Sequence, residues 1–145
     1  MTNAKNDNWI IQTMQQLNLP DAQYAVFGSG LLDVLGIKKA NDIDLVVTKE
    51  LFDTLGQQGE WARFVYPDGY PGLKHALYDM ELFYRSDMPL CDLGGVERMI
   101  RDAVAIQGIK FVQLKDILVW KKSLGREKDV RAVKLIEAYI KELRL

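Results

Sequence analysis

The chain has 145 residues, 48% of them hydrophobic and 27% charged, with a formal net charge of −1. These values predict one compact domain over residues 1–145 and argue against a protein held to nucleic acid by bulk positive charge. No apolar run reaches the ~20 residues of a membrane-spanning helix, and we expect the polar segment 1–7 to be a flexible leader. The single cysteine, Cys91, excludes an internal disulfide and fits a reducing compartment, so we expect a cytoplasmic protein with no membrane partner.

Hydrophobic periodicity in the first half of the chain predicts alternating helices and strands. The apolar residues of the first segment fall on one helical face, and a short apolar run before Gly28 is typical of a buried strand. The expected elements are a helix over about 8–17, a strand at 24–27, a helix at 31–35, a strand at 42–47 and a helix at 49–57.

In the second half, glycine and proline mark the ends of the predicted elements. The turn Pro67-Asp68-Gly69 ends one strand, and Gln107-Gly108 lies between two short apolar runs, as in a hairpin. The expected elements are strands at 61–66 and 76–84, a short helix at 96–101, hairpin strands at 103–106 and 109–112, and helices at 114–124 and 127–143. This order indicates an α+β domain in which helices flank a mixed sheet and a helical pair closes the chain.

The strand predicted at 42–47 carries two carboxylates on one face. Asp42 and Asp44 stand at i and i+2, whereas Ile43 and Leu45 point to the opposite side. The carboxylate oxygens can converge on a divalent cation, and Mg²⁺ is usually held by one or two carboxylates together with substrate phosphates. The alternative is a polar edge strand with two solvated aspartates.

The segment Gly28-Ser29-Gly30 lies between a predicted strand and a predicted helix. Such a loop presents backbone N–H groups and a helix N-terminus to a phosphate, and glycine lets the backbone approach closely. Ser29 either contacts the phosphate or only caps the helix. A plain dinucleotide binder that uses Gly28 and Gly30 is disfavoured because Asp33 stands where the fingerprint requires a third glycine.

Taken together, these two elements resemble the signature of the nucleotidyltransferase superfamily. Phe27-Gly28-Ser29, a short helix and then Asp42-Ile43-Asp44-Leu45-Val46 match its order: an apolar residue, glycine, glycine or serine, a spacer of about a dozen residues, and an Asp-apolar-Asp motif. The resemblance covers roughly the first third of the chain. It implies a nucleotidyltransferase-like fold in which Gly28 and Ser29 bind the phosphates of an NTP, such as ATP, while Asp42 and Asp44 act in catalysis and hold Mg²⁺ or Mn²⁺.

Members of this family usually carry a third carboxylate on a neighbouring strand. Asp79 and Glu81 have the same strand parity, so both are candidates. We prefer Glu81, which precedes an apolar pair as the family's strand would suggest, as the third catalytic residue and metal ligand. If the family motif requires aspartate here, glutamate relaxes the metal geometry.

The segment from Lys121 to Asp129 resembles the Lys…Gly-Arg-x-Lys-Asp motif near the end of small stand-alone nucleotidyltransferases. These include proteins linked to antibiotic resistance and to toxin–antitoxin or phage-abortive systems. The resemblance implies that Lys121 is an inward lysine and that Arg126 is a partner of the triphosphate. The alternative is a solvated helix junction in which Asp129 interacts favourably with the helix dipole.

The resemblance implies transfer of a nucleoside monophosphate from an NTP to a hydroxyl group, with release of pyrophosphate. The acceptor stays open among a small molecule, a protein and an RNA, and a homodimer that completes the site is also left open. The alternative function is a catalytically weak or inactive binding module that acts through a protein partner. We expect His75, the only histidine, to be a surface or loop residue, and Trp120 to belong to the core.

Overall fold

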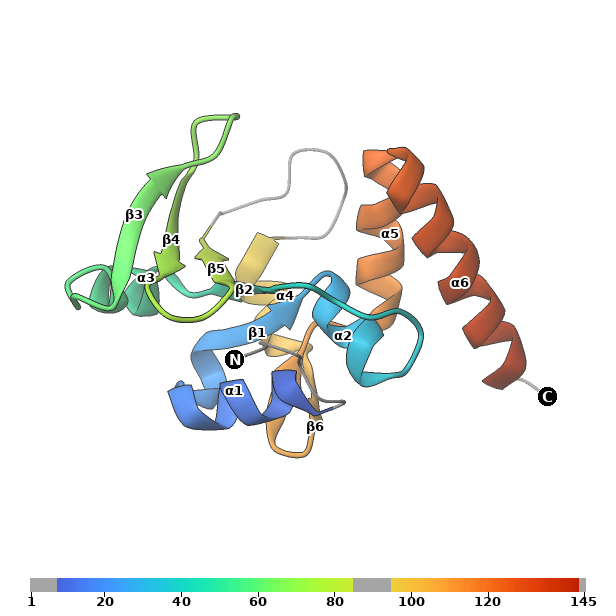
Figure 1. Cartoon of the computed structure of the whole chain (residues 1–145), viewed down its shortest axis with the longest axis horizontal. Coiled ribbons are helices and arrows are strands. Elements are labelled where there is room, and N and C mark those ends of the chain that lie inside the picture. The colour runs from blue at the N-terminus through green and yellow to red at the C-terminus, as the bar shows by residue number, and fades with distance from the viewer. Residues whose placement is uncertain (1–7, 85–94, 144–145) are drawn as a thin grey trace, which may run out of the picture.

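A computed structural model of the chain describes residues 8–84 and 95–143 (Figure 1). The expected leader at 1–7 and Cys91 lie outside the described residues. The helices are α1 (Trp9–Leu17), the 3₁₀ helix η1 (Asp21–Gln23), α2 (Ser29–Val34), α3 (Lys49–Leu55), α4 (Gly95–Arg101), α5 (Leu114–Leu124) and α6 (Glu127–Leu143). The strands are β1 (Tyr24–Phe27), β2 (Ile43–Val47), β3 (Trp61–Val65), β4 (Pro71–His75), β5 (Met80–Phe83), β6 (Val104–Ile106) and β7 (Ile109–Phe111).

Within the described residues, seven strands form one sheet in the order β3-β4-β5-β2-β1-β7-β6. The β2/β5 and β1/β7 pairs are parallel and the other pairs are antiparallel. The sheet is therefore mixed, and the expectation of an α+β fold with a C-terminal helical pair is confirmed. None of the described helices combines the length and the apolar character needed to span a bilayer.

The strand expected at 76–84 is wrong in its first half, and the strand β4 before it was not predicted. Residues 76–79 form a turn, and only Met80–Phe83 pair as β5. Proline and glycine, which begin β4, are depleted in strands, so their pattern did not indicate one. Gly72 is tolerated because the rings of Phe64 and Tyr66 occupy the space beside it. A Cβ at Gly72 would lie 2.7 Å from ring carbons of both residues.

One face of the central strand β2 is buried in the core, and Asp44 projects from the other face. Ile43 and Leu45 of β2 are fully buried, and Asp44 between them is only partly buried. This is the alternation expected for a strand with period 2. Because Asp44 lies opposite Phe27 of β1 and opposite Glu81 of β5, the register places these three residues next to one another across the sheet.

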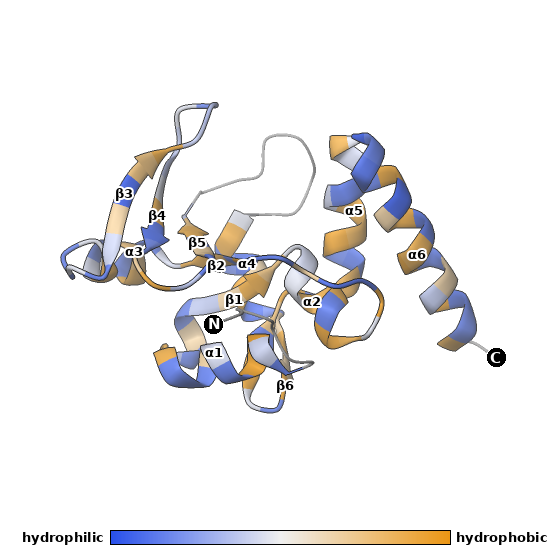
Figure 2. Ribbon diagram, in the orientation of Figure 1, coloured by the Kyte–Doolittle hydropathy of each residue, from blue (hydrophilic) through white to orange (hydrophobic). Residues whose placement is uncertain are grey.

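The C-terminal helices pack against each other at one end of the molecule, while the β3–β4 hairpin rises at the other end (Figure 1). Hydrophilic and hydrophobic residues alternate along α6 (Figure 2), as in a helix that covers a neighbour with one side. Gly125, in a left-handed conformation with φ 63°, ends α5 and lets the chain reverse into α6.

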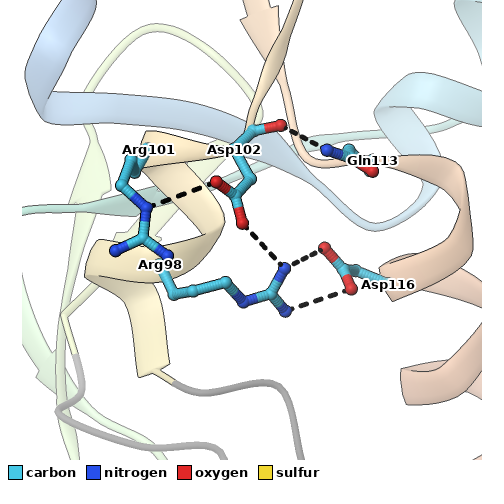
Figure 3. Close-up of polar contacts among 5 residues, drawn as sticks. All are labelled: Arg98, Arg101, Asp102, Gln113 and Asp116. Carbon is cyan, nitrogen blue, oxygen red and sulfur yellow. Dashed lines mark hydrogen bonds and ion pairs between the residues drawn. The ribbon is translucent and has the colours of Figure 1, made fainter.

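A set of ion pairs holds α5 against α4 (Figure 3). The Arg98 guanidinium donates to both carboxylate oxygens of Asp116, at 2.9 and 3.0 Å, and also contacts Asp102 at 3.5 Å. The Gln113 amide donates to the Asp102 carbonyl oxygen at 2.7 Å. Asp116 is 8% exposed, so these bonds satisfy a carboxylate that has little access to water. The cluster orients α5, the helix that carries Trp120 and Lys121.

Candidate functional site

A cavity of about 570 Å³ lies between the β3–β4 hairpin and the C-terminal helices. All seven residues predicted for the site line it: Gly28, Ser29, Asp42, Asp44, Glu81, Lys121 and Arg126. The cavity is also lined by aromatic and apolar residues, namely Phe27, Tyr66, Pro67, Phe83, Trp120 and Leu124, and by Asp68 and Lys128. The fold therefore brings together residues from both ends of the chain.

Gly28 gives the backbone a close approach to the carboxylates. Because Phe27 pairs with Asp44, the residue after Phe27 leaves the sheet beside that aspartate. Gly28 has φ 71°, a conformation that favours glycine, and a Cβ there would lie 3.7 Å from Asp44 Oδ2. The helix α2 begins directly at Ser29, two residues earlier than expected. Gly28 and Ser29 thus stand between the acidic residues and α5.

The Asp44 carboxyl is the electrostatic centre of the site. Burial raises its pKa to about 7, and the neighbouring carboxylates of Asp42 and Glu81 add to this rise. Lys121 and Lys128 oppose it through their positive charges. A carboxyl surrounded in this way gains most from a nearby cation, because a positive charge removes the repulsion among the three acidic groups.

Of the two candidates for a third carboxylate, Glu81 is the one that lines the main cavity. Glu81 lies opposite Asp44 in the parallel β2/β5 pair. Asp79 instead lines a smaller neighbouring cavity of about 280 Å³, which Asp42 and Glu81 also border. The backbone carbonyl of Asp79 accepts the N–H of Ile43 at 2.9 Å, just before β5 begins.

A divalent cation at this position would need ligands beyond the protein's own carboxylates. In the described part of the chain, no three Asp, Glu, His or Cys side chains are grouped closely enough to hold a metal ion alone. Mg²⁺ commonly keeps several waters and binds through one or two carboxylates plus substrate phosphates. Asp42 and Asp44 fit that mode, in which the nucleotide supplies the missing oxygens.

Neither a comparison with models of known protein families nor one with curated protein sequences finds a match for this chain. The function of this chain is therefore inferred from the geometry of the cavity.

Lys121 points into the protein, toward the glycine-serine loop. Its side chain is 9% exposed, and Nζ lies 3.5 Å from Ser29 Oγ and 3.8 Å from Asp129 Oδ1. Burial lowers the pKa of Lys121, and the carboxylate of Asp129 works against that change. Asp129 is itself fully buried. The pair places a positive charge beside Ser29, where a phosphate group could be bound.

Arg126 lines the cavity but is already bound to a carboxylate. Its Nε and Nη2 donate to the two oxygens of Asp129, at 2.5 and 3.2 Å, and half of its side chain is exposed. Asp129 also accepts the backbone N–H of Arg126 at 3.3 Å, in the manner of a helix cap. The Nε and Nη2 groups of Arg126 are therefore already occupied by Asp129, although the side chain lines the cavity.

Two further residues, Lys128 and Trp120, line the cavity beyond the seven predicted ones. Lys128, within the Gly-Arg-x-Lys-Asp motif, also lines the cavity, and its position in that motif was the signal for it. Trp120 lines the cavity as well, with its ring 4.5 Å from that of Phe27, so it is more than a core residue.

The expectation of a surface or loop position for His75 is wrong. His75 belongs to β4 and is 6% exposed. Its Nδ1 accepts the backbone N–H groups of Leu77 and Tyr78, at 3.0 and 3.2 Å, and its ring packs edge-on against Trp61. His75 therefore stabilises the turn that leads into β5. Sequence periodicity could not show this, because β4 itself was not recognised.

Proposed function

We propose that this protein is a metal-dependent nucleotidyltransferase that moves a nucleoside monophosphate from an NTP to a hydroxyl acceptor. The observation that carries the proposal is the position of Asp44. It shares the cavity with Asp42 and Glu81, whose negative charges raise its pKa, and Lys121 of α5 and Lys128 of α6 line the same cavity and lower that pKa. A nucleoside triphosphate bound with a divalent cation matches both charges, because it offers a cation to the acidic side and phosphate oxygens to the basic side.

The basic side of the cavity supplies the phosphate contacts. Lys121 and Ser29 face each other across 3.5 Å, and Lys128 lines the same cavity. Gly28 adds a close backbone approach without a side chain in the way. In the proposed complex these groups bind the β- and γ-phosphates, and Arg126 contributes from the rim.

The acidic residues of the cavity would hold the metal. Asp42 and Asp44 would bind one or two Mg²⁺ or Mn²⁺ ions together with phosphate oxygens. When bound, the metal would neutralise charge on the entering and leaving oxygens of an in-line displacement. Ile43 and Leu45, which flank Asp44 in β2, are fully buried, so strand parity directs the Asp44 side chain to the opposite face. Asp42 precedes β2 and is exposed, and it lines the same cavity.

In the proposed reaction the nucleoside monophosphate is transferred in a single displacement at the α-phosphorus. The acceptor oxygen forms a bond to the α-phosphorus, the bond between that phosphorus and the bridging oxygen breaks, and pyrophosphate leaves. In the proposed reaction Glu81, which lies opposite Asp44 in the sheet, accepts the proton of the hydroxyl group.

A second candidate function is a binding module that retains the fold without catalysis. The absence, in the described residues, of three acidic or histidine side chains grouped tightly enough for a metal favours it. Calorimetry with Mg²⁺ and a non-hydrolysable NTP separates the two functions. Metal-dependent binding of the nucleotide supports the enzyme, and no such binding supports the module.

The direct test uses an NTP labelled at the α-phosphate and fractions of small molecules, RNA and protein as acceptors. The wild-type chain is expected to transfer label, and the Asp42→Ala/Asp44→Ala double variant is expected to transfer none. Asp53→Asn is the matched control, because this aspartate lies on the exposed side of α3, paired with Lys49. Full activity in the double variant would refute the assignment.

A further inference from the structure

The turn of the β3–β4 hairpin brings a tyrosine to the acidic side of the cavity. Tyr66 follows directly after β3 and lines the cavity together with Pro67 and Asp68. Its backbone N–H donates to the carbonyl of Tyr70 at 2.8 Å, and its carbonyl accepts the N–H of Gly69 at 2.9 Å. The backbone of Tyr66 is therefore fixed by the turn.

The ring of Tyr66 is also fixed, by two other aromatic rings. Its centroid lies 4.7 Å from that of Phe64 and 6.1 Å from that of Phe83, with interplanar angles of 62° and 84°. Such edge-to-face packing restricts rotation and adds stability beyond the buried area. Gly72 makes the packing possible, because any Cβ there would collide with the rings of Phe64 and Tyr66.

The hydroxyl group of this fixed ring reaches the candidate third carboxylate. Tyr66 Oη donates to Glu81 Oε1 at 3.3 Å. Glu81 needs such a partner, because it lies opposite Asp44 in the sheet and the two carboxylates repel each other. On its other side Glu81 lies opposite Lys74 of β4, whose flexible ammonium group does not fix the carboxylate as the ring-anchored hydroxyl group of Tyr66 does.

We infer that Tyr66 is a positioning residue whose hydroxyl holds the Glu81 carboxylate beside Asp44. The contact itself is a property of the fold, whereas its effect on phosphoryl transfer rests on the proposed function. Tyr66 acts through Glu81 and is given no contact with the reacting atoms.

A double-mutant cycle on unfolding tests the contact without any substrate. Tyr66→Phe keeps the ring and removes the hydroxyl group, and is expected to lower the urea midpoint by about 0.5 M in the wild-type background. In a Glu81→Ala background the same change should have no effect. Equal shifts in both backgrounds would overturn the inference. The matched control is Tyr84→Phe, since Tyr84 Oη donates to Glu97 at 3.2 Å, outside the cavity, and its effect should be the same with or without Glu81.

Kinetics of the full chain test the consequence for catalysis. Once labelling has identified an acceptor fraction, Tyr66→Phe should lower kcat by about tenfold, the value of one hydrogen bond to a charged group, with the KM for the NTP changed less than about twofold. Gly72→Ala, which displaces the ring, should lower kcat at least as much, and Tyr84→Phe should leave it unchanged. An unchanged kcat in Tyr66→Phe overturns the positioning role. If the wild-type chain transfers no label, the proposed function fails, and the unfolding cycle alone decides whether Tyr66 holds Glu81.

Discussion

Replacing Asp44 with asparagine should stabilise the metal-free protein, and the gain should grow with pH. The folded chain raises the pKa of Asp44 from its ordinary 3.8 to about 7. Between about pH 3.8 and pH 7 the Asp44 carboxyl is ionised in the unfolded chain but keeps its proton in the folded chain. The wild-type protein therefore carries no penalty from Asp44 below about pH 3.8, and it loses stability through this carboxyl as the pH rises to about 7. The difference of 7 − 3.8 = 3.2 pH units corresponds to about 4 kcal/mol at 1.36 kcal/mol per unit.

The assay is urea unfolding of both proteins in a chelator from pH 4 to pH 8, with the free energy of unfolding obtained by linear extrapolation. Asp44→Asn and wild type should be nearly equal at pH 4, and the variant should be more stable by up to about 4 kcal/mol at pH 8. Asp53→Asn, on an exposed helix surface, should show no such trend. A stability difference that stays constant across the pH range would refute the reasoning, because it would mean that Asp44 does not titrate abnormally in the folded chain.

Three further predictions concern the metal, α5 and His75. At pH 8, Mg²⁺ together with a non-hydrolysable NTP should raise the unfolding temperature of the wild type and not that of Asp44→Asn, and scans with and without chelator check this; an equal rise in both proteins would contradict it. Arg98→Ala should lower the free energy of unfolding in urea by about 2 kcal/mol, because Asp116 loses two hydrogen bonds while it stays buried. The control Arg101→Ala removes an exposed side chain and should lower it much less. Equal losses in the two variants would contradict the role of the cluster. Burial lowers the pKa of His75 below its ordinary 6.5, so wild-type stability should fall as the pH drops below about 6.5, and His75→Gln should weaken this dependence; an unchanged slope in the variant would count against it.

Local patterns predicted most of the elements well. The hairpin around Gln107 and Gly108 is confirmed by the antiparallel pairing of β6 with β7. Both turn residues adopt positive φ, at 50° and 81°, as a two-residue hairpin turn favours. The helices α1, α5 and α6 follow from periodicities that lie within each segment. β4 was missed because Gly72 is required by the rings of Phe64 and Tyr66, which pack beside it. A pattern within residues 71–75 does not contain these two rings.

The same contrast applies to the candidate site. Asp42 and Asp44 both line the cavity, as parity along the predicted strand suggested, although Asp42 lies in the bend that precedes β2. Parity could not choose between Asp79 and Glu81, which share it. The parallel pairing of β2 with β5 places Glu81 opposite Asp44, and register of this kind depends on residues far apart in the chain.

The amino-acid order alone was therefore sufficient for the α+β architecture, the glycine-serine loop and the acidic pair, since each is written in a short stretch of residues. Long-range packing was needed to bring Lys121 beside Ser29 and to set Tyr66 against Glu81. These contacts join segments separated by turns and strands, and their geometry follows from how the whole sheet and its helices fit together.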